Sequence, residues 1–314
     1  MKVVVTGGSG FVGREVVRQL RLAGHAVRVL GRNASPESGV EWVRGSILDF
    51  PNLPSVLVGF DVVIHLVGII SEVGDQTFER VHTSGTANVV QAARTAGVRR
   101  MIHMSALGTR PNAVARYHRS KWEAEEAVRR SGLAWTIFRP SLIYGPGDGF
   151  VTFFARLARW LPVLPIMGSG THRIQPVAVE DVARCFAAAP GSSATVGQTY
   201  DLCGPEAFTF TEVMRIILAA AHRPRGLVHL PLPLARAQAA LLEVVYPTIF
   251  GSAPPLNRDQ IQMLQEDNVG DPGPAAQVFG FQPRPFAEEL QRLFAGSEAP
   301  FSRTLSAQPT SKMP

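Results

Sequence analysis

Three polar residues have the types and spacing of an acid–base site for hydride chemistry. Tyr117 and Lys121 form a Y-x-x-x-K pattern in the segment YHRSK, and Ser105 lies twelve positions before the tyrosine. Residues four apart on a helix share one face, so the phenol and the amine would be neighbours. A nearby cation favours the phenolate and lowers the pKa of the phenol. A tyrosine tuned in this way can give or take a proton while a hydride moves.

A tyrosine–lysine pair with this spacing is common on charged helices. Whether it indicates an acid–base site therefore depends on the residues around it. Ser105 lies at the end of a strand predicted in the segment VRRMIHMSALG, and the helix carrying Tyr117 follows. At such a strand end, the serine hydroxyl could hydrogen-bond a substrate oxygen. The serine, tyrosine and lysine together indicate an acid–base site far more specifically than the pair does.

Three glycines near the N-terminus have the spacing of a phosphate-binding turn. Gly7, Gly10 and Gly13 form G-x-x-G-x-x-G between a β-branched run at 3–5 and an amphipathic helix. In this context, glycines allow a tight turn, close approach to a pyrophosphate, and packing of helix against strand. The helix also directs its free N–H groups and its dipole at the phosphates. The pattern favours dinucleotide binding over a turn without a ligand.

The elements that must position these residues alternate through the first half of the chain. Runs rich in Val and Ile predict six strands, in the segments 2–6, 25–33, 40–49, 59–68, 98–108 and 133–145. Helices are predicted between them, most clearly over 77–97 and 116–132. This alternation predicts an α/β doubly wound parallel sheet, the Rossmann fold, whose ligands bind beyond the carboxyl ends of the strands.

The composition changes after Gly145, where Pro and Gly become frequent. We expect residues 1–145 to form an NAD(P)-binding Rossmann domain. Residues 146–296 should form a small substrate lobe interleaved with the last sheet strands. The polar, aperiodic residues 297–314 predict a disordered tail.

The net charge of +6 comes mainly from Arg residues that are spread along the helices. This distribution favours a solvated basic surface over nucleic-acid binding, and leaves a mild attraction to lipid headgroups open. Cys185 and Cys203 have no metal-ligand spacing and no disulfide framework, which indicates a reducing compartment. The chain starts directly with a strand, so we expect no cleaved signal and a cytoplasmic protein, peripheral to a membrane at most.

The motifs together resemble the short-chain dehydrogenase/reductase superfamily, in its extended or atypical branch of NAD-dependent epimerases and dehydratases. The resemblance covers about residues 1–225 and rests on VTGGSGFVG, SGTANVVQAA, MSALG, YHRSK, FRPSLIYGPGD and QPVAVEDVA. It implies that Ser105 orients the reacting oxygen and Tyr117 is the acid or base. Lys121 would lower the pKa of Tyr117 and hold the nicotinamide ribose.

The resemblance also implies a set of nucleotide-binding residues and one substrate residue. Besides Tyr117 and Lys121, the nucleotide set is Thr6, Gly7, Gly10, Phe11, Val12, Gly13, Arg32, Ser46, Ile47, Leu66, Val67, Gly68, Pro140 and Ile143. Arg173 matches a position where sugar-nucleotide enzymes hold a substrate phosphate, although a structural role is equally supported. No metal site is implied.

Two positions depart from the family pattern. His82 stands where the extended enzymes usually carry an Asn that orders the catalytic lysine and a water, which puts the proton relay in doubt. The loop Gly45–Ser46–Ile47 replaces the usual Gly-Asp-hydrophobic sequence, so Ile47 can still cover the adenine while the Asp contact is lost or replaced.

Arg32 bears on the choice of nucleotide. NAD-specific sites place a carboxylate after the second strand, where it accepts from the ribose 2′-OH. Here the sequence is Gly31–Arg32, and an Arg offers a planar fork that suits a 2′-phosphate. We therefore favour NADP(H) over NAD(H), the alternative being an Arg that stacks on adenine without choosing.

Within this branch, the chain resembles one smaller group more specifically. Later segments such as PPLNRDQIQMLQEDNV are similar to bacterial relatives of the dehydrogenase-like accessory subunit of respiratory complex I. Two function classes therefore stay open. One is an NADP(H)-dependent oxidoreductase acting on a small carbonyl, alcohol or quinone-related substrate. The other is a nucleotide-holding accessory or assembly protein of complex I, and a sugar-nucleotide epimerase or dehydratase is a weaker third. The apolar segment at 232–250 is expected to pack on the substrate lobe, rather than to meet a quinone or membrane.

Overall fold

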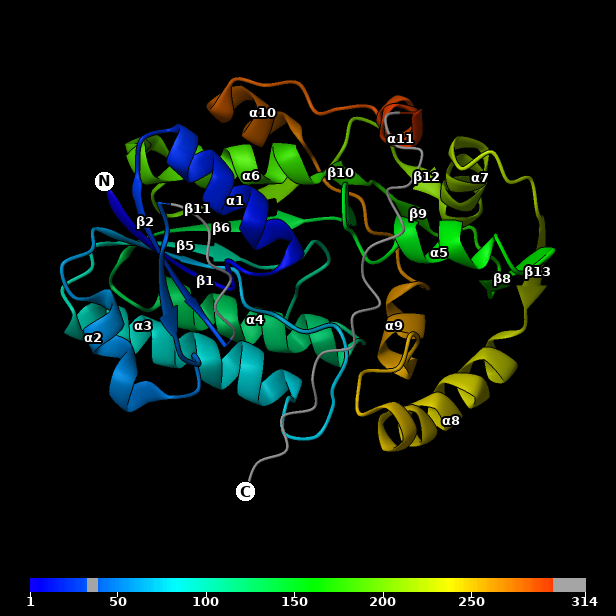
Figure 1. Ribbon diagram of the computed structural model, residues 1–314, viewed down its shortest axis with the longest axis horizontal. Coiled ribbons are helices and arrows are strands. Elements are labelled where there is room, and N and C mark those ends of the chain that lie inside the picture. The colour runs from blue at the N-terminus through cyan, green and yellow to red at the C-terminus, as the bar shows by residue number, and fades with distance from the viewer. Residues whose placement is uncertain (33–38, 296–314) are drawn as a thin grey trace.

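The computed structural model describes residues 1–32 and 39–295. Its centre is a parallel sheet in the order β11-β6-β5-β4-β1-β2-β3 (Figure 1). Six of these strands come from the first half of the chain: β1 (Lys2–Thr6), β2 (Ala26–Gly31), β3 (Glu41–Arg44), β4 (Val62–His65), β5 (Arg100–Met104) and β6 (Ala134–Pro140). The seventh, β11 (Gln198–Leu202), pairs with β6. The predicted doubly wound fold is confirmed, and β11 is the part of the sheet that comes from the later half of the chain.

Helices cover both faces of this sheet, as Figure 1 shows. One layer holds α1 (Phe11–Leu22), α6 (Val179–Ala188) and α10 (Gly273–Phe279), and the other holds α2 (Leu53–Leu57), α3 (Gly85–Thr95) and α4 (Arg116–Arg129). The strand β1 shows why two layers are needed. Val3 and Val5 lie in the core under α1, whereas Val4 lies in the opposite core. Because side chains alternate along a strand, an apolar run can be buried only between two layers.

A second lobe extends from the sheet, on the right of Figure 1. Its helices are α5 (Val151–Leu157), α7 (Phe210–Ala220), α8 (Leu232–Phe250), α9 (Arg258–Met263) and α11 (Phe286–Ala295). Its short strands are β7 (Ile143–Tyr144), β8 (Val163–Met167), β9 (Arg173–Ile174), β10 (Val177–Ala178), β12 (Phe208–Thr209) and β13 (Gly226–Leu230). The predicted tail at 297–314 lies outside the described residues.

The order of strands fixes where a ligand can bind. The chain runs outward from β1 through β2 to β3, and then returns to β4 on the other side of β1. The loops after β1 and β4 therefore diverge at the carboxyl edge of the sheet. Such a switch point is where open α/β sheets bind their ligands.

A buried carboxylate holds α4 against this sheet. The side chain of Glu125 has no exposed surface, and it accepts two hydrogen bonds from Arg139 on β6, at 2.8 Å and 2.6 Å. Arg129, one turn further along α4, donates to the same carboxylate at 2.5 Å. The three side chains form a paired cluster, in which Glu125 is fully buried while Arg139 and Arg129 are 21% and 24% exposed. Removing Glu125 would leave the half-buried Arg139 without its paired carboxylate, whereas Arg129 would keep Glu126.

We expect Glu125→Gln to lower the free energy of unfolding by about 3 kcal/mol, because it removes one member of a buried ion-pair cluster. Glu126→Gln is the matched control on the same helix. Glu126 pairs with Arg130, which is 79% exposed, and with Arg129 at 3.0 Å, and its own side chain is 26% exposed, so the loss should be about 1 kcal/mol. Urea unfolding of both variants measures the difference, and equal losses would contradict a special role for Glu125.

Candidate active site

The glycine turn between β1 and α1 is shaped by close backbone contacts. A Cβ atom on Gly13 would lie only 2.2 Å from the carbonyl oxygen of Gly7, so α1 packs on the turn as only a glycine permits. Gly7 has a φ of +81°, in the left-handed region that favours glycine. Gly10 begins the helix as its N-cap, and a Cβ atom there would meet only the Gly7 oxygen, at 3.3 Å.

This turn fits a pyrophosphate. Gly10 brings no capping side chain, so the first N–H groups of α1 are left to an anion. A Cβ atom on Gly7 would lie 3.1 Å from the backbone of Leu66 and Val67, which places the turn against the loop after β4. The remaining residues predicted here, Phe11 and Val12, begin α1, and Val12 is buried. The turn and the loop after β4 thus form the two sides of the switch point.

Thr6, which was predicted to bind the nucleotide, and His65 lie at the carboxyl ends of β1 and β4 and share a hydrogen bond. The hydroxyl of Thr6 and Nδ1 of His65 are 2.6 Å apart, and Nε2 of His65 lies 3.1 Å from the hydroxyl of Thr86. Burial lowers the pKa of His65 to about 3, and the positive charge of Lys121 adds to this effect. His65 is therefore a neutral histidine with both ring nitrogens paired.

The helix α4 carries Tyr117 in its first turn, and a carboxylate from the second lobe caps that turn. Asp259 of α9 accepts hydrogen bonds from the backbone N–H groups of Arg116 and Tyr117, at 2.8 Å and 2.9 Å. Free N–H groups at a helix start need such an acceptor. Asn257, just before α9, donates to the carbonyl of Ile70 in the loop after β4. The segment around α9 therefore ties the tyrosine helix to that loop.

Lys121 lies one turn beyond Tyr117, and its amine reaches the carboxyl ends of the central strands. Its Nζ donates to the carbonyl of Met104 at 2.7 Å, one residue before Ser105. A Cβ atom on Gly68 would lie 3.6 Å from this Nζ, so the glycine gives access to the amine. Burial lowers the pKa of Lys121 to about 8, with Glu125 opposing the shift. The structure thus brings the amine next to Ser105 and the loop after β4.

Tyr117 behaves differently from the expectation. Burial raises the pKa of its phenol to about 12, whereas the sequence analysis predicted that Lys121 would lower it. That prediction is wrong for this structure, because the amine is directed to Met104 and desolvation of the phenol dominates. A phenol keeps its proton at neutral pH even at its ordinary pKa, and burial moves the pKa of Tyr117 further in that direction.

His82 joins the loop after β4 to the tyrosine helix. Its Nε2 accepts from the N–H of Ile69 at 3.0 Å, which leaves the proton on Nδ1. Nδ1 lies 2.8 Å from the hydroxyl of Ser120, and that hydroxyl donates to the carbonyl of Tyr117 at 2.8 Å. The histidine sits in a π-helical turn, Glu79–Ser84, a feature often found at functional sites.

The rings of His82 and Tyr117 also meet edge to face, with centroids 5.4 Å apart. Burial, with help from Lys121, lowers the pKa of His82 to about 2. His82 is thus a neutral connector whose two ring nitrogens already have partners.

Ser105 is buried at the end of β5, and a late segment covers the loop beyond it. The hydroxyl of Ser105 donates to that of Thr109 at 3.3 Å. Asn268 donates to the carbonyl of Leu107 at 3.0 Å, and its own amide oxygen accepts from the hydroxyl of Ser141. Pro140 and Ile143 flank Ser141, so the predicted nicotinamide loop lies beside this cover.

The predicted adenine-side residues lie at the ends of β2 and β3. Arg32 is exposed directly after β2, next to the residues that are not described. Ile47 is buried on Gly85 of α3, where a Cβ atom would come within 2.5 Å of its side chain. The hydroxyl of Ser46 accepts from the N–H of Leu48 at 3.2 Å, so it supports the turn.

Arg173 lies outside this cluster of residues. It is 57% exposed and pairs with Asp267 at 3.4 Å, and its backbone N–H donates to the same carboxylate at 2.8 Å. These contacts support the structural role that the sequence left open, since a substrate anion would have to compete with Asp267.

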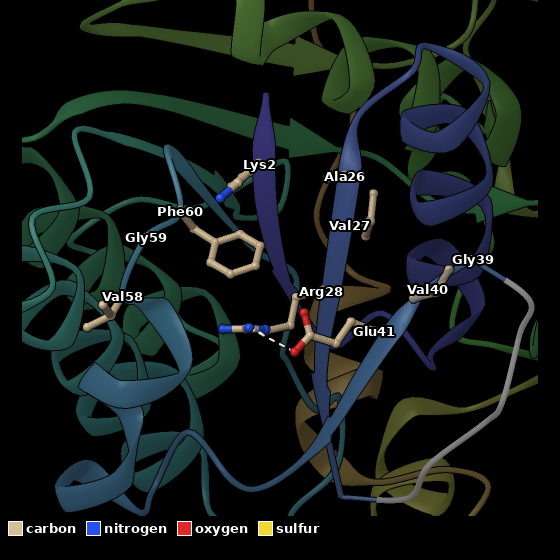
Figure 2. Close-up of a pocket in the computed structure, with 10 residues that line it drawn as sticks. All are labelled: Lys2, Ala26, Val27, Arg28, Gly39, Val40, Glu41, Val58, Gly59 and Phe60. Carbon is tan, nitrogen blue, oxygen red and sulfur yellow. Dashed lines mark ion pairs between the residues drawn. The ribbon is translucent and has the colours of Figure 1, made fainter.

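Figure 2 shows a cavity of about 620 Å³ at the opposite edge of the sheet. It is lined by Lys2, Ala26, Val27, Arg28, Gly39, Val40, Glu41, Val58, Gly59 and Phe60. Two of its charged groups already have partners, because Arg28 pairs with Glu41 at 2.8 Å and lies over the ring of Phe60. The cavity lies at the amino ends of β1 and β2, so it is not the ligand site that the switch point predicts.

Comparison with known proteins agrees with this geometry. Residues 3–203 match the NAD dependent epimerase/dehydratase family. The chain belongs to this family. The family, the fold and the general NAD(P)-dependent class that the sequence predicted are therefore confirmed, whereas the substrate and the choice between NADP and NAD remain proposals.

Its relatives in curated proteins include enzymes and a respiratory subunit. The ceramide reductase of Caulobacter vibrioides is 34% identical over 79% of this chain and 81% of its own. NADH dehydrogenase (ubiquinone) 1 alpha subcomplex subunit 9 of Arabidopsis thaliana is 31% identical over 84% of this chain and 70% of its own. The predicted likeness to complex I accessory subunits is therefore confirmed.

Solved structures share the whole fold. The crystal structure of gox2253 has a TM-score of 0.71 at 26% identity, covering 93% of this chain and 96% of that one. UDP-glucose 4-epimerase of Thermotoga maritima has a TM-score of 0.72 at 20% identity, covering 94% and 98%. The second likeness shows the fold alone.

Sequence reasoning missed the residues that the second lobe sends to this site. Asp259 and Asn268 contact the loops around Tyr117 and Ser105 from more than 140 positions away. One signal was present, because Asn257 and Gln260 form a capping box that marks the start of α9. That signal predicts a helix but not the element that the helix contacts.

We expect Gly10→Val to abolish nucleotide binding without loss of fold, because the new side chain fills the space of a pyrophosphate and little else. Gly13→Val should instead destabilise the protein, since its Cβ atom would overlap the backbone of Gly7. Gly191→Val is the control, because a Cβ atom there meets nothing within 4 Å. NADPH titration and thermal unfolding measure both effects, and unchanged affinity in Gly10→Val would place the phosphates elsewhere.

Proposed function

We propose that the protein is an NADP(H)-dependent reductase of a small carbonyl or quinone-related compound. The observation that carries the proposal is an arrangement of three residues: Tyr117 lies on a capped helix, one turn from the buried amine of Lys121, and that amine donates to the residue before Ser105. A protonated phenol suits the direction of reduction, in which the substrate oxygen gains a proton. Relatives named ceramide reductase and 2-alkyl-3-oxoalkanoate reductase support the same direction.

Residues 1–145 would bind the nucleotide, and residues 146–296 would form the substrate lobe. When bound, the nicotinamide supplies a hydride to the substrate carbon. Ser105 would orient the substrate oxygen by a hydrogen bond, and Tyr117 would donate its phenolic proton to that oxygen. Lys121 would hold the ribose hydroxyls with the donors that Met104 does not use.

The residues assigned to the nucleotide lie on both sides of the switch point. The turn Gly7–Gly13 would hold the pyrophosphate, and Leu66, Val67 and Gly68 would lie beneath the nicotinamide ribose. The backbone around Gly68 is open to Lys121, which agrees with this placement. On the adenine side, Arg32 is exposed at the end of β2 and would pair with a 2′-phosphate.

A second candidate function is a nucleotide-holding accessory protein of a respiratory complex, at the periphery of a membrane. The similarity to the Arabidopsis thaliana complex I subunit favours it. His82 favours it too, because this residue connects two elements instead of relaying a proton. A sugar-nucleotide epimerase or dehydratase is supported less, because Ala106 and Leu107 follow Ser105 where such an enzyme would carry an acidic residue or Thr.

For the reductase, we expect Tyr117→Phe to lower turnover by about 10²–10⁴-fold, because only the proton donor is removed. NADPH affinity should stay close to that of the unaltered protein. The measurement is NADPH oxidation with a panel of ketones, aldehydes and quinones. Tyr200→Phe, a buried tyrosine of β11, is the matched control and should keep full activity.

The same variant separates the two candidate functions in cells. Full complementation of a deletion strain by Tyr117→Phe would reject the catalytic function. Failure to complement, with normal NADPH affinity and normal stability, would reject the holder. Lys121→Ala should weaken both turnover and NADPH binding. This amine lies one turn from the proposed proton donor, Tyr117, and it would also hold the ribose hydroxyls of the nucleotide.

The nucleotide preference has its own test. We expect Arg32→Asp to weaken NADPH binding far more than NADH binding, because it replaces the phosphate partner with a repelling charge. Arg94→Asp makes the same change of charge on the exposed end of α3 and should affect neither nucleotide. Calorimetric titration gives both affinities, and an equal loss for the two nucleotides would contradict recognition of the 2′-phosphate by Arg32.

A further inference from the structure

The helix α8 turns its large apolar side chains outward. Leu234, Leu241, Val244, Val245 and Ile249 are between 40% and 70% exposed. The buried residues of the helix are only Ala235 and Ala239, which pack against Ile261 of α9. This arrangement is the reverse of an ordinary surface helix, whose large apolar residues face the core.

The exposed residues form one stripe, which we call the α8 stripe. Positions 234, 241, 244, 245 and 249 follow the three-and-four spacing of a single helical face. Neither charged residue of the helix belongs to the stripe. Glu243 pairs with Arg258 at 2.7 Å, and Arg236 contacts Gln262 at 3.4 Å, so both are turned towards α9. The stripe is thus uncharged along a helix about 28 Å long.

A second exposed apolar segment lies at the same end of the lobe. Trp160 is 79% exposed, and Leu161 and Val163 are exposed beside it. The strands β8 and β13 pair side by side, and Arg225 donates to the carbonyl of Ala158, so this segment adjoins β13, the strand that leads into α8. In Figure 1, β8 and β13 lie at the outer end of the second lobe, away from the central sheet, and α8 runs from β13 back towards α9.

The concentration of apolar surface at this end is high. Among the described residues, 20 large apolar side chains are exposed, and 11 of them fall in the segments 153–163 and 228–250. Clustered exposed apolar residues mark a contact surface, whereas single ones need no explanation. The helix at 232–250 packs on the lobe through Ala235 and Ala239, while the described residues leave its outer face uncovered.

The charges of these segments are mostly positive. Residues 153–163 and 222–258 contain six arginines, at 156, 159, 223, 225, 236 and 258, against the single carboxylate of Glu243. A second copy of the chain would bring two such cationic sets together, which disfavours self-association. An anionic surface with an apolar layer beneath it complements both features.

We propose that the α8 stripe lies on the surface of an anionic phospholipid bilayer, with the neighbouring arginines at the phosphate headgroups. In the described part of the chain, no helix is long and apolar enough to cross a membrane, and a surface contact requires none. The second candidate function places the protein at the periphery of a membrane. The proposed contact specifies the segment that touches the membrane and the lipids it meets, and it does not depend on the reductase chemistry.

The α8 stripe is connected to the candidate active site through the segment that follows α8 in the chain. The chain passes from α8 through Asn257, which donates to Ile70, to Asp259, which caps the helix of Tyr117. A protein that rests on α8 would therefore hold these loops near the lipid surface.

The test is flotation of the full chain with two kinds of vesicle, pure phosphatidylcholine and an equal mixture of phosphatidylcholine and phosphatidylglycerol. We expect binding to the mixed vesicles that weakens as salt rises. Leu241→Glu/Val244→Glu should bind them at least about ten-fold more weakly. Leu22→Glu/Val58→Glu adds the same charges at side chains of similar exposure, 71% and 60%, and should bind nearly as well as the unaltered protein.

Each other outcome counts against the proposal. Absence of binding to mixed vesicles, equal binding to both vesicle types, or equal loss in the two double variants would overturn it. Sedimentation that shows a dimer for the unaltered chain and a monomer for Leu241→Glu/Val244→Glu, without vesicle binding, would assign the stripe to a second copy. NADPH affinity, measured on the same variants, keeps failure of the proposed reductase distinguishable from failure of the lipid contact.

Discussion

The site depends on keeping one amine buried at the carboxyl edge of the sheet. Lys121 is 2% exposed, and a charge in that position is costly unless polar groups surround it. The carbonyl of Met104 takes one of its donors, while Glu125 lies one turn further along the same helix. The nearby histidines, 65, 82 and 103, stay neutral because burial and the lysine both lower their pKa values. A neutral ring beside the amine adds no repulsion.

This constraint explains why the pKa of the tyrosine is raised. The amine is drawn to the strand carbonyl, so the phenol is left in a site where desolvation raises its pKa to about 12. A spacing rule on a helix gives proximity of the two residues, but it does not give the direction in which the amine points. The predicted face was therefore right, while the predicted effect on the phenol was wrong, because desolvation is a property of the folded surroundings.

The sequence could predict features that depend on residues close together in the chain, and could not predict contacts between segments that are far apart in it. The glycine motif lies within one turn of the chain, at Gly7, Gly10 and Gly13. A Cβ atom on Gly13 would overlap the backbone of Gly7, so the spacing of the glycines alone was enough to predict the turn. The alternation of buried valines in β1 likewise predicted two helical layers. The cap of α4 by Asp259 depends instead on how α9 docks, and no local pattern specifies that contact. The outward stripe of α8 was visible as apolar sequence, but its orientation required the packing of Ala235 and Ala239.

The two halves of the chain therefore carry different kinds of information. The family match ends at residue 203, and the glycine turn, Ser105, Tyr117 and Lys121 all lie within it. Asn257, Asp259 and Asn268 lie beyond it, yet they fix the loops that surround the acid–base residues. Changes in the later segment can alter what reaches Tyr117 without changing how a nucleotide is held. Relatives named as reductases and as a respiratory subunit can then share one nucleotide fold, because their differences need only arise in the part of the chain that covers it.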